Sequence, residues 1–111
     1  MGSEMCIRDR RTNNEFQFNL RANNGLVILT SEGYTAKAGC LNGIKSVREN
    51  SQLDARYARE TAKDGRLYFN LKAGNGEIIG TSQMYQSESA RETGITSVKN
   101  NASGATVEDL S

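Results

Sequence analysis

The chain has 111 residues, of which 36% are hydrophobic and 24% charged, a composition inside the globular range and outside that of disordered chains. Its 14 basic and 13 acidic residues leave a net charge of +1, so no overall field favours a polyanion or an anionic membrane. Histidine is absent from the sequence, which excludes His-based general-base catalysis, Ser-His-Asp and Cys-His dyads, and His metal sites.

The cysteines and the hydropathy pattern bear on the location of the protein. Cys6 and Cys40 form neither a CxxC motif nor a dense disulfide framework. The sequence shows neither a secretory h-region nor an apolar run of about 18 residues. We therefore expect a cytoplasmic protein with reduced cysteines and no membrane partner. A chain of this length also favours one hydrophobic core over two.

An internal repeat organises the sequence. A shift of 51 positions aligns residues 18–51 with residues 69–102 without a gap, and 15 of the 34 pairs are identical. Such self-similarity indicates one supersecondary unit that is used twice. We place repeat 1 at residues 12–54 and repeat 2 at residues 55–111. Together they are expected to form one compact domain, a monomer with an internal pseudo-twofold axis.

Residues 1–11, MGSEMCIRDRR, fit the repeat poorly. The shift of 51 places Cys6 at the position of Tyr57, in a predicted strand, yet the segment carries charges on both faces of such a strand. The string MCIRDR also resembles a translated adapter peptide of the kind found at the ends of metagenomic assemblies. We expect this segment to be non-native or artefactual and assign no role to Cys6.

Each repeat continues with a predicted β-hairpin. Alternating apolar residues precede Asn24-Gly25 and a β-branched run, and repeat 2 follows the same pattern around Asn75-Gly76. Asn-Gly is typical of a two-residue turn in which both residues have positive φ. That turn predicts core-facing cross-strand pairs, which in repeat 1 are Ala22 with Val27, Leu20 with Leu29, and Phe18 with Ser31.

The opposite face of the predicted hairpins is polar in both copies and is our candidate binding face. It consists of Asn19, Arg21, Ile28, Thr30, Asn70, Lys72, Ile79 and Thr81. Amide side chains donate and accept hydrogen bonds, and the two basic residues attract anions. The alternative is that Thr and Ile are simply good strand formers and the face is only solvated. Because the face is repeated, a ligand should be matched by both copies or lie across their axis.

A helix is predicted after each hairpin. Thr35 and Ser87 are candidate N-cap residues, because a hydroxyl can accept a hydrogen bond from an unpaired amide of the first turn. The apolar stripes are Ala36, Cys40, Gly43, Ile44 and Val47 in repeat 1, and Ala90, Gly94, Ile95 and Val98 in repeat 2. These stripes predict that each helix covers the apolar face of the sheet.

Gly43 and Gly94 recur in the middle of the two predicted helices, where glycine costs about 1 kcal/mol relative to alanine. We expect a close approach to offset this cost, either between the two helices or between helix and sheet at the pseudo-twofold axis. Simple tolerance of the glycines is the alternative.

Repeat 2 has a further extended run at residues 56–61, followed by Asp64-Gly65. A two-residue turn would place Tyr57 on the polar face, whereas a three-residue turn with Gly65 in the left-handed conformation places it in the core opposite Leu71. We favour the three-residue turn. Residues 105–110 are predicted to form a short closing strand. Each unit is therefore expected to have three strands and a helix, followed by a fourth strand at least in repeat 2.

These motifs carry a family resemblance. The FNLRANNG and FNLKAGNGEIIGTSQMY hairpins, each followed by a helix with a Gly-Ile-x-Ser-Val core, resemble the YegP-like family of uncharacterised bacterial proteins (UPF0339), which are tandem DUF1508 repeats. The resemblance covers about residues 12–111. It implies an α+β fold of two β(3)-α-β units that share one mostly antiparallel sheet, with both helices on one face and the C-terminal strands exchanged. It implies no activity.

The remaining chemistry of the chain is sparse. Cys40 lies on a core stripe and is expected to be a small buried hydrophobe, not a reactive thiol. Arg91, its counterpart in repeat 2, is expected to pair with a local carboxylate, with anchoring of a ligand as the alternative. The carboxylates share no spacing between the copies, which argues against a carboxylate pair or a metal cage. Gly74-Asn75-Gly76 leads into a strand, which favours a hairpin over a phosphate-binding loop.

We expect no catalytic, cofactor-binding or metal-binding residues, and therefore a non-enzymatic binding or structural module. Its partner on the candidate binding face is expected to be a protein or a small anionic ligand. Nucleic-acid binding by the same face is the first alternative, although the net charge does not support it and the face lacks stacking aromatic residues. An enzyme that acts through Ser, Tyr or carboxylates is the second alternative.

Overall fold

The computed structural model describes residues 3–10 and 15–109, which form seven β-strands and two α-helices. The N-terminal half contains β1 (Glu4–Arg10), β2 (Glu15–Arg21), β3 (Val27–Ser31) and α1 (Lys37–Asn50). A 3-10 helix, η1 (Asp54–Arg56), leads into the second half, which contains β4 (Tyr57–Thr61), β5 (Leu67–Lys72), β6 (Ile78–Thr81), α2 (Glu88–Ala102) and β7 (Thr106–Asp109).

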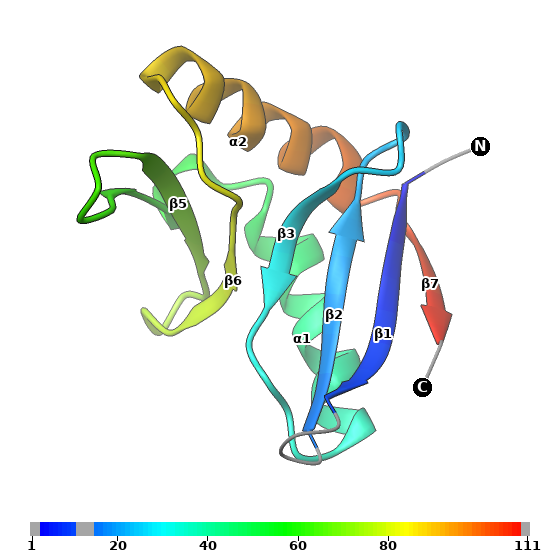
Figure 1. Cartoon of the computed structure of the whole chain (residues 1–111). Helices are drawn as coiled ribbons and strands as arrows, with labels where there is room; N and C mark the ends of the chain where they lie inside the picture. The colour runs from blue at the N-terminus through cyan, green and yellow to red at the C-terminus, as the bar shows by residue number, and fades with distance from the viewer. Residues whose placement is uncertain (1–2, 11–14, 110–111) are drawn as a thin grey trace.

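The seven described strands form one sheet in the order β4-β5-β6-β3-β2-β1-β7. All neighbouring strands are antiparallel except β1 and β7, which lie side by side at one edge (Figure 1). The two repeats meet where β3 pairs with β6, and Thr30 lies directly opposite its own counterpart Thr81. The pseudo-twofold axis therefore passes between these two threonines, and the expected shared sheet is confirmed.

The two units differ in how they close. In repeat 2, β7 follows α2 and pairs in parallel with β1 of repeat 1, so this C-terminal strand crosses to the other copy as expected. In repeat 1, η1 follows α1 and leads directly into β4 at the opposite edge. Strand crossing thus runs in one direction, and the described part of the chain has seven strands instead of the eight that two complete β(3)-α-β units require.

The hairpin turns have three residues, and the predicted two-residue Asn-Gly turn is wrong. Ala22 N donates to Leu26 O at 2.9 Å, and Gly25 has a φ of 83°. Leu20 pairs with Leu29 as predicted, but the longer turn displaces the next pair, so that Arg21 faces Val27 across a β-bulge. Repeat 2 has the same turn and the same bulge. A bulge inserts one unpaired residue into the ladder, here Ile28 and Ile79.

The turn between β4 and β5 agrees with its prediction. Ala62 N donates to Arg66 O at 2.7 Å, and Gly65 has a φ of 88°, which fits a three-residue turn. Tyr57 lies opposite Leu71 and is buried, and its hydroxyl donates to Ser51 O at 2.8 Å.

Strand β1 corrects the predicted alignment of the N-terminal segment by one residue. Met5 pairs with Leu20, as Tyr57 pairs with Leu71, so Met5 and not Cys6 takes the place of Tyr57. A one-residue slip exchanges the two faces of a strand. Met5 and Ile7 therefore point into the core, where they are 0% and 1% exposed. The interpretation of residues 1–11 as non-native stays a prediction, and residues 1–2 and 11–14 lie outside the described part.

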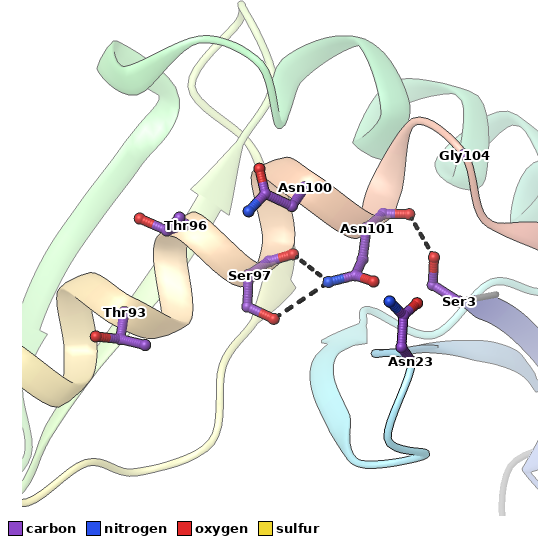
Figure 2. A pocket seen from close by; sticks show the side chains of 8 residues that line it. All are labelled: Ser3, Asn23, Thr93, Thr96, Ser97, Asn100, Asn101 and Gly104. Atoms are coloured by element: carbon purple, nitrogen blue, oxygen red, sulfur yellow. Dashed lines mark hydrogen bonds between the residues drawn. The ribbon is translucent and has the colours of Figure 1, made fainter. Parts of the chain in front are cut away.

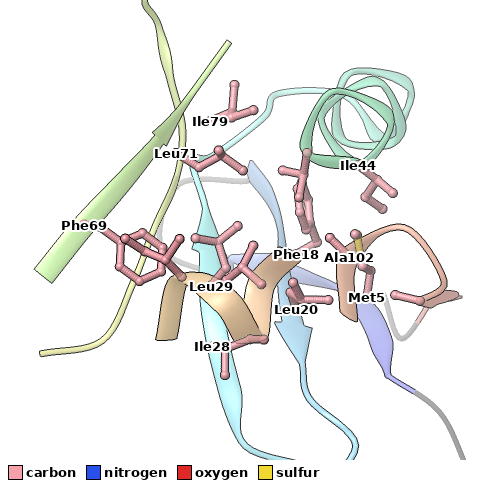
Figure 3. Packing of buried hydrophobic residues seen from close by; sticks show 14 of the residues in the cluster. Met5, Phe18, Leu20, Ile28, Leu29, Ile44, Phe69, Leu71, Ile79 and Ala102 are labelled. Carbon is pink, nitrogen blue, oxygen red and sulfur yellow. The ribbon is translucent and has the colours of Figure 1, made fainter. Parts of the chain in front are cut away.

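The core lies between the sheet and the two helices, which pack on the same face of the sheet (Figure 3). Of the predicted stripes, Ala36 is exposed and Ala90 is half-buried, whereas the remaining members are buried. Each helix contacts both repeats: α1 packs on β2, β5 and β6, and α2 packs on β2, β3 and β5. None of the described helices is long and apolar enough to span a membrane.

The predicted helix N-caps have different outcomes. Ser87 is the N-cap of α2, and its Oγ accepts a hydrogen bond from Ala90 N at 3.1 Å, as expected. Helix α1 begins after Ala36, which gives no side-chain cap, so the prediction for Thr35 is wrong.

The mid-helix glycines accommodate a tyrosine ring of their own repeat. A Cβ on Gly43 would lie 2.7 Å from Tyr34 Cζ, and a Cβ on Gly94 would lie 2.5 Å from Tyr85 Cζ. Each tyrosine extends the sheet through an isolated bridge, Phe16 with Tyr34 and Leu67 with Tyr85. A close approach therefore does exist, but it is made by a side chain within each copy and not by the helices at the axis.

Candidate functional site

The outer face of the sheet, opposite the helices, carries a polar row that crosses the pseudo-twofold axis. The pairs Asn19 with Thr30, Thr30 with Thr81, and Thr81 with Asn70 place these four residues in one line across β2, β3, β6 and β5. We call these four residues the polar row. Thr81 Oγ1 donates to Asn70 Oδ1 at 2.9 Å, and Asn70 is only 8% exposed, whereas Thr30 and Asn19 form no such bond with each other. The structure thus brings together four of the eight predicted residues.

The two basic residues of the predicted face lie at opposite ends of the polar row. Arg21 is two residues beyond Asn19 on β2, and Lys72 is two residues beyond Asn70 on β5, which runs in the opposite direction. Arg21 Nη1 donates to Gly25 O at 2.9 Å. Within residues 3–10 and 15–109 neither side chain forms an ion pair, although Glu4 on β1 lies directly opposite Arg21.

The two predicted isoleucines do not belong to this face. Ile28 and Ile79 are the bulged residues of β3 and β6, and they are only 6% and 8% exposed, within the hydrophobic core. The three-residue turn shifts the strand pairing by one residue, which leaves Ile28 and Ile79 unpaired in the two bulges. Their side chains therefore pack inward. Their prediction as binding-face residues is wrong.

A small acidic cluster lies at the edge of the outer face. Donor atoms of Glu4, Cys6 and Glu108 lie within 4.8 Å of one another, the one such group of three possible metal ligands in the described part of the chain. Burial raises the pKa of the Cys6 thiol, and the thiol donates to Glu4 Oε2 at 3.6 Å. Hydrogen bonding and repulsion from Glu4 raise the pKa of Glu108. Groups of exposed acidic side chains are common without a metal, so we assign none to this cluster.

Cys40 and Arg91 occupy equivalent core positions. Cys40 is 0% exposed and burial raises the pKa of its thiol, which agrees with its prediction as a buried hydrophobe. Arg91 is 8% exposed, lies 3.6 Å from Glu92 and 3.9 Å from Glu88, and its Nη1 donates to Glu60 O at 3.4 Å. The expected local pairing of Arg91 is therefore present.

A polar hollow that sequence reasoning missed lies between α2 and the β2–β3 turn (Figure 2). Its volume is about 420 Å³, within the usual range for small-molecule sites. All of its side chains are neutral amides or hydroxyls, and the lining residues are Ser3, Asn23, Thr93, Thr96, Ser97, Asn100, Asn101 and Gly104. Asn101 Nδ2 donates to Ser97 O at 2.7 Å, and Ser3 Oγ donates to Asn101 O at 2.9 Å (Figure 2).

The only sequence signal for this hollow is the pair Ser97 and Asn101, which repeats Ser46 and Asn50. The spacing of four residues places both side chains on one face of a helix. The other walls come from β2–β3 and from the start of β1, whose proximity to α2 depends on the tertiary fold.

Comparison with known families finds two copies of one domain. The family described as "Domain of unknown function (DUF1508)" matches residues 12–57 and residues 62–109. The two matches contain β2, β3 and α1 in the first copy and β5, β6, α2 and β7 in the second, and β1 lies before the first match.

Relatives and solved structures agree with this match. The chain is 56% identical over 101 residues to a UPF0339 protein of Shewanella oneidensis, covering 91% of this chain and 92% of the relative. It is 53% identical over 100 residues to the UPF0339 protein YegP of Escherichia coli strain K12, covering 90% and 91%.

Two solution NMR structures are similar to the fold described above. One is UPF0339 protein SO3888 of Shewanella oneidensis, with a TM-score of 0.91 at 53% identity over 99% of this chain and 92% of that chain. The other is E. coli YegP, described as a protein of unknown function, with a TM-score of 0.92 at 49% identity over 99% and 94%.

Proposed function

The chain belongs to the DUF1508 family as a tandem pair of its domains, and on that premise we propose that it is a non-catalytic binding module. Its binding surface is the outer face of the shared sheet, centred on the polar row. The observation that carries this proposal is the alignment of Asn19, Thr30, Thr81 and Asn70 across the pseudo-twofold axis, with one basic residue at each end.

The spacing of the basic residues indicates the kind of partner. Neighbouring strands lie about 4.8 Å apart and residues rise about 3.4 Å along a strand, so in a flat sheet the Cα atoms of Arg21 and Lys72 are on the order of 20 Å apart. A small anion cannot contact both cations, but about six residues of extended peptide can. We therefore propose an extended acidic segment of a partner protein, with carboxylates at Arg21 and Lys72 and its backbone over the polar row.

The non-catalytic part of the proposal rests on the chemistry of the described residues. The hollow next to α2 is lined by amides and hydroxyls that do not titrate near neutral pH. The tyrosines with raised pKa values, Tyr34, Tyr57 and Tyr85, owe the rise mainly to burial. A cytoplasmic setting is part of the same proposal, and the two free cysteines support it.

The test is a titration of a fluorescein-labelled octapeptide of alternating Glu and Thr, followed by fluorescence anisotropy at low salt. The matched variants are Arg21→Glu with Lys72→Glu, and Lys45→Glu with Lys63→Glu, which change net charge equally on α1 and in the β4–β5 turn, outside the polar row and its two ends. We expect the first pair to weaken binding about tenfold or more, and the second pair to weaken it much less.

Three outcomes contradict the proposal: no binding at low salt, equal weakening by both pairs, or equal binding of the peptide with Gln in place of Glu. A single-stranded oligonucleotide added as competitor distinguishes peptide binding from nucleic-acid binding by the same face. If it binds more tightly than the peptide, with an affinity that falls steeply with salt, the face is a nucleic-acid site.

A further inference from the structure

The hollow next to α2 has a counterpart in the other copy, and the comparison of the two indicates a ligand. The C-terminal half of α2 lines the hollow together with Asn23 of the β2–β3 turn of repeat 1. In the other copy, Arg56 contacts both Asn50 at the end of α1 and Gly74 of the β5–β6 turn. Asn101 therefore corresponds to Asn50, and Asn23 corresponds to Gly74. This inference concerns a different surface from the outer face and is independent of the function proposed there.

In the α1 copy, an arginine of the chain fills the corresponding space. Arg56 Nε donates to Asn50 Oδ1 at 2.9 Å, and Arg56 Nη2 lies 3.6 Å from the position of a Cβ on Gly74. The guanidinium thus lies between helix and turn. Arg56 forms no ion pair with any residue of the described ranges, so a neutral amide oxygen is enough to hold it there.

In the α2 copy, the equivalent side-chain amide of Asn101 is held in the same way, but its oxygen is free to accept a hydrogen bond. Asn101 Nδ2 donates to Ser97 O at 2.7 Å and to Ser97 Oγ at 3.3 Å, as Asn50 Nδ2 donates to Ser46 O at 2.9 Å and to Ser46 Oγ at 3.1 Å. No described residue donates to Asn101 Oδ1. These bonds fix the amide orientation, so the oxygen is presented to the hollow.

In the α2 copy, the residue equivalent to Arg56 is not a cation. Arg56 immediately precedes Tyr57, and the strand pairing makes Tyr57 equivalent to Met5. The counterpart of Arg56 in this chain is therefore Glu4, which lies in the segment of residues 1–11 that we predict to be non-native. We propose that the hollow lined by Ser97 and Asn101 is a binding site for a guanidinium group supplied from outside the chain.

The lining of the hollow suits this ligand. Its amide and hydroxyl oxygens accept hydrogen bonds from several directions, which matches the five N–H donors of a planar guanidinium better than the compact ammonium of lysine. The α1 counterparts of Thr96 and Asn100 are Lys45 and Glu49, so one cation and one anion of the α1 copy are both replaced by neutral residues here.

The proposal is tested by ¹H–¹⁵N NMR titration with the peptide Ac-Gly-Arg-Gly-NH₂, and with matched peptides that carry citrulline or lysine. We expect the arginine peptide to shift the side-chain amides of Asn23 and Asn101, and the other two to bind at least fivefold more weakly. Agmatine is titrated in parallel. Equal or tighter binding of agmatine identifies a small guanidinium ligand, and tighter binding of the peptide identifies an arginine side chain of a partner protein.

Variants of Thr96, which is exposed on α2, provide the matched control. Thr96→Glu should tighten binding of the arginine peptide about threefold to tenfold, and Thr96→Lys should weaken it by a similar factor. Asn101→Ala should abolish the shifts, whereas Asn50→Ala should leave affinity unchanged. The proposal is overturned if the guanidinium probes cause no shifts at the hollow, if the citrulline and lysine peptides bind equally well, or if the Thr96 variants have no effect.

Discussion

Tyr34 occupies the space in which Gly43 would carry a side chain: a Cβ there would lie 2.7 Å from Tyr34 Cζ and closer still to the hydroxyl oxygen. The same relationship joins Tyr85 and Gly94. The tyrosine rings also stack on the core, with ring centroids 6.4 Å apart for Phe18 and Tyr34. Both copies therefore depend on a glycine for the fit between helix and sheet.

Gly43→Ala should lower the free energy of unfolding by about 1–3 kcal/mol, because the overpacking outweighs the gain of about 1 kcal/mol in helix propensity. Urea unfolding measures the change. The matched control is Gly39→Ala on the same helix, where a Cβ would lie at an ordinary 3.5 Å from Tyr34 Cδ1, so stability should stay equal or rise. Gly43→Ala in a Tyr34→Leu background should be nearly neutral. If Gly43→Ala is stabilising in the native background, the steric account is wrong.

Ile28→Ala should destabilise the protein by about 2–4 kcal/mol, because Ile28 is 6% exposed within the core. Leu26 is close in sequence but 59% exposed, so Leu26→Ala should change stability by less than about 0.5 kcal/mol. Chemical denaturation of both variants tests the bulge in β3. Similar small effects of the two substitutions would mean that Ile28 lies on the solvated face, as the two-residue turn predicts.

Ser87→Ala should cost about 1 kcal/mol, because it removes the acceptor for Ala90 N at the start of α2. Thr35→Ala is the matched control, since Thr35 caps no helix, and its effect should be close to zero. The measurement is the midpoint of thermal unfolding, and an equal fall in both variants would show that the assigned cap is not the cause.

Stability should fall as the pH rises above about 10. Burial raises the pKa values of Tyr34, Tyr57 and Tyr85, so their contribution is complete below the unfolded-state pKa of about 10 and is lost as pH rises toward the folded-state values. Tyr57→Phe should lower stability at pH 8, because it removes the hydrogen bond to Ser51 O, but should flatten the decline above pH 10. Urea unfolding from pH 8 to pH 11.5 compares the two proteins, and parallel curves would exclude Tyr57 from the alkaline transition.

The repeat and its hydrophobic pattern were sufficient to predict the hairpins, the two helices and most of the core, and the family resemblance implied the shared sheet. They failed where one residue decides the direction of a side chain. Asn24-Gly25 suits both a two-residue and a three-residue turn, since both place Gly25 at positive φ. The choice rests on Ala22 bonding to Leu26, a contact that alternation of apolar residues does not encode.

The candidate site was predictable only in part, for related reasons. The polar row lies in the regularly paired part of the strands, outside the two bulges. Simple alternation along each strand therefore predicts the face of its four residues. The hollow next to α2 depends on a helix of one repeat packing near the turn of the other. In the α1 copy, Arg56 fills the corresponding space between Asn50 and Gly74. This difference between the copies is seen only when they are compared in three dimensions.

The most direct test of the proposed function is a ¹H–¹⁵N NMR titration with the Glu-Thr octapeptide that follows the backbone amides of Thr30 and Thr81. These residues face each other at the pseudo-twofold axis, so a segment that spans the outer face must pass over both. We predict one bound peptide per chain and shifts of both amides that saturate together. Shifts in only one repeat, or shifts outside the polar row alone, would contradict recognition across the two copies.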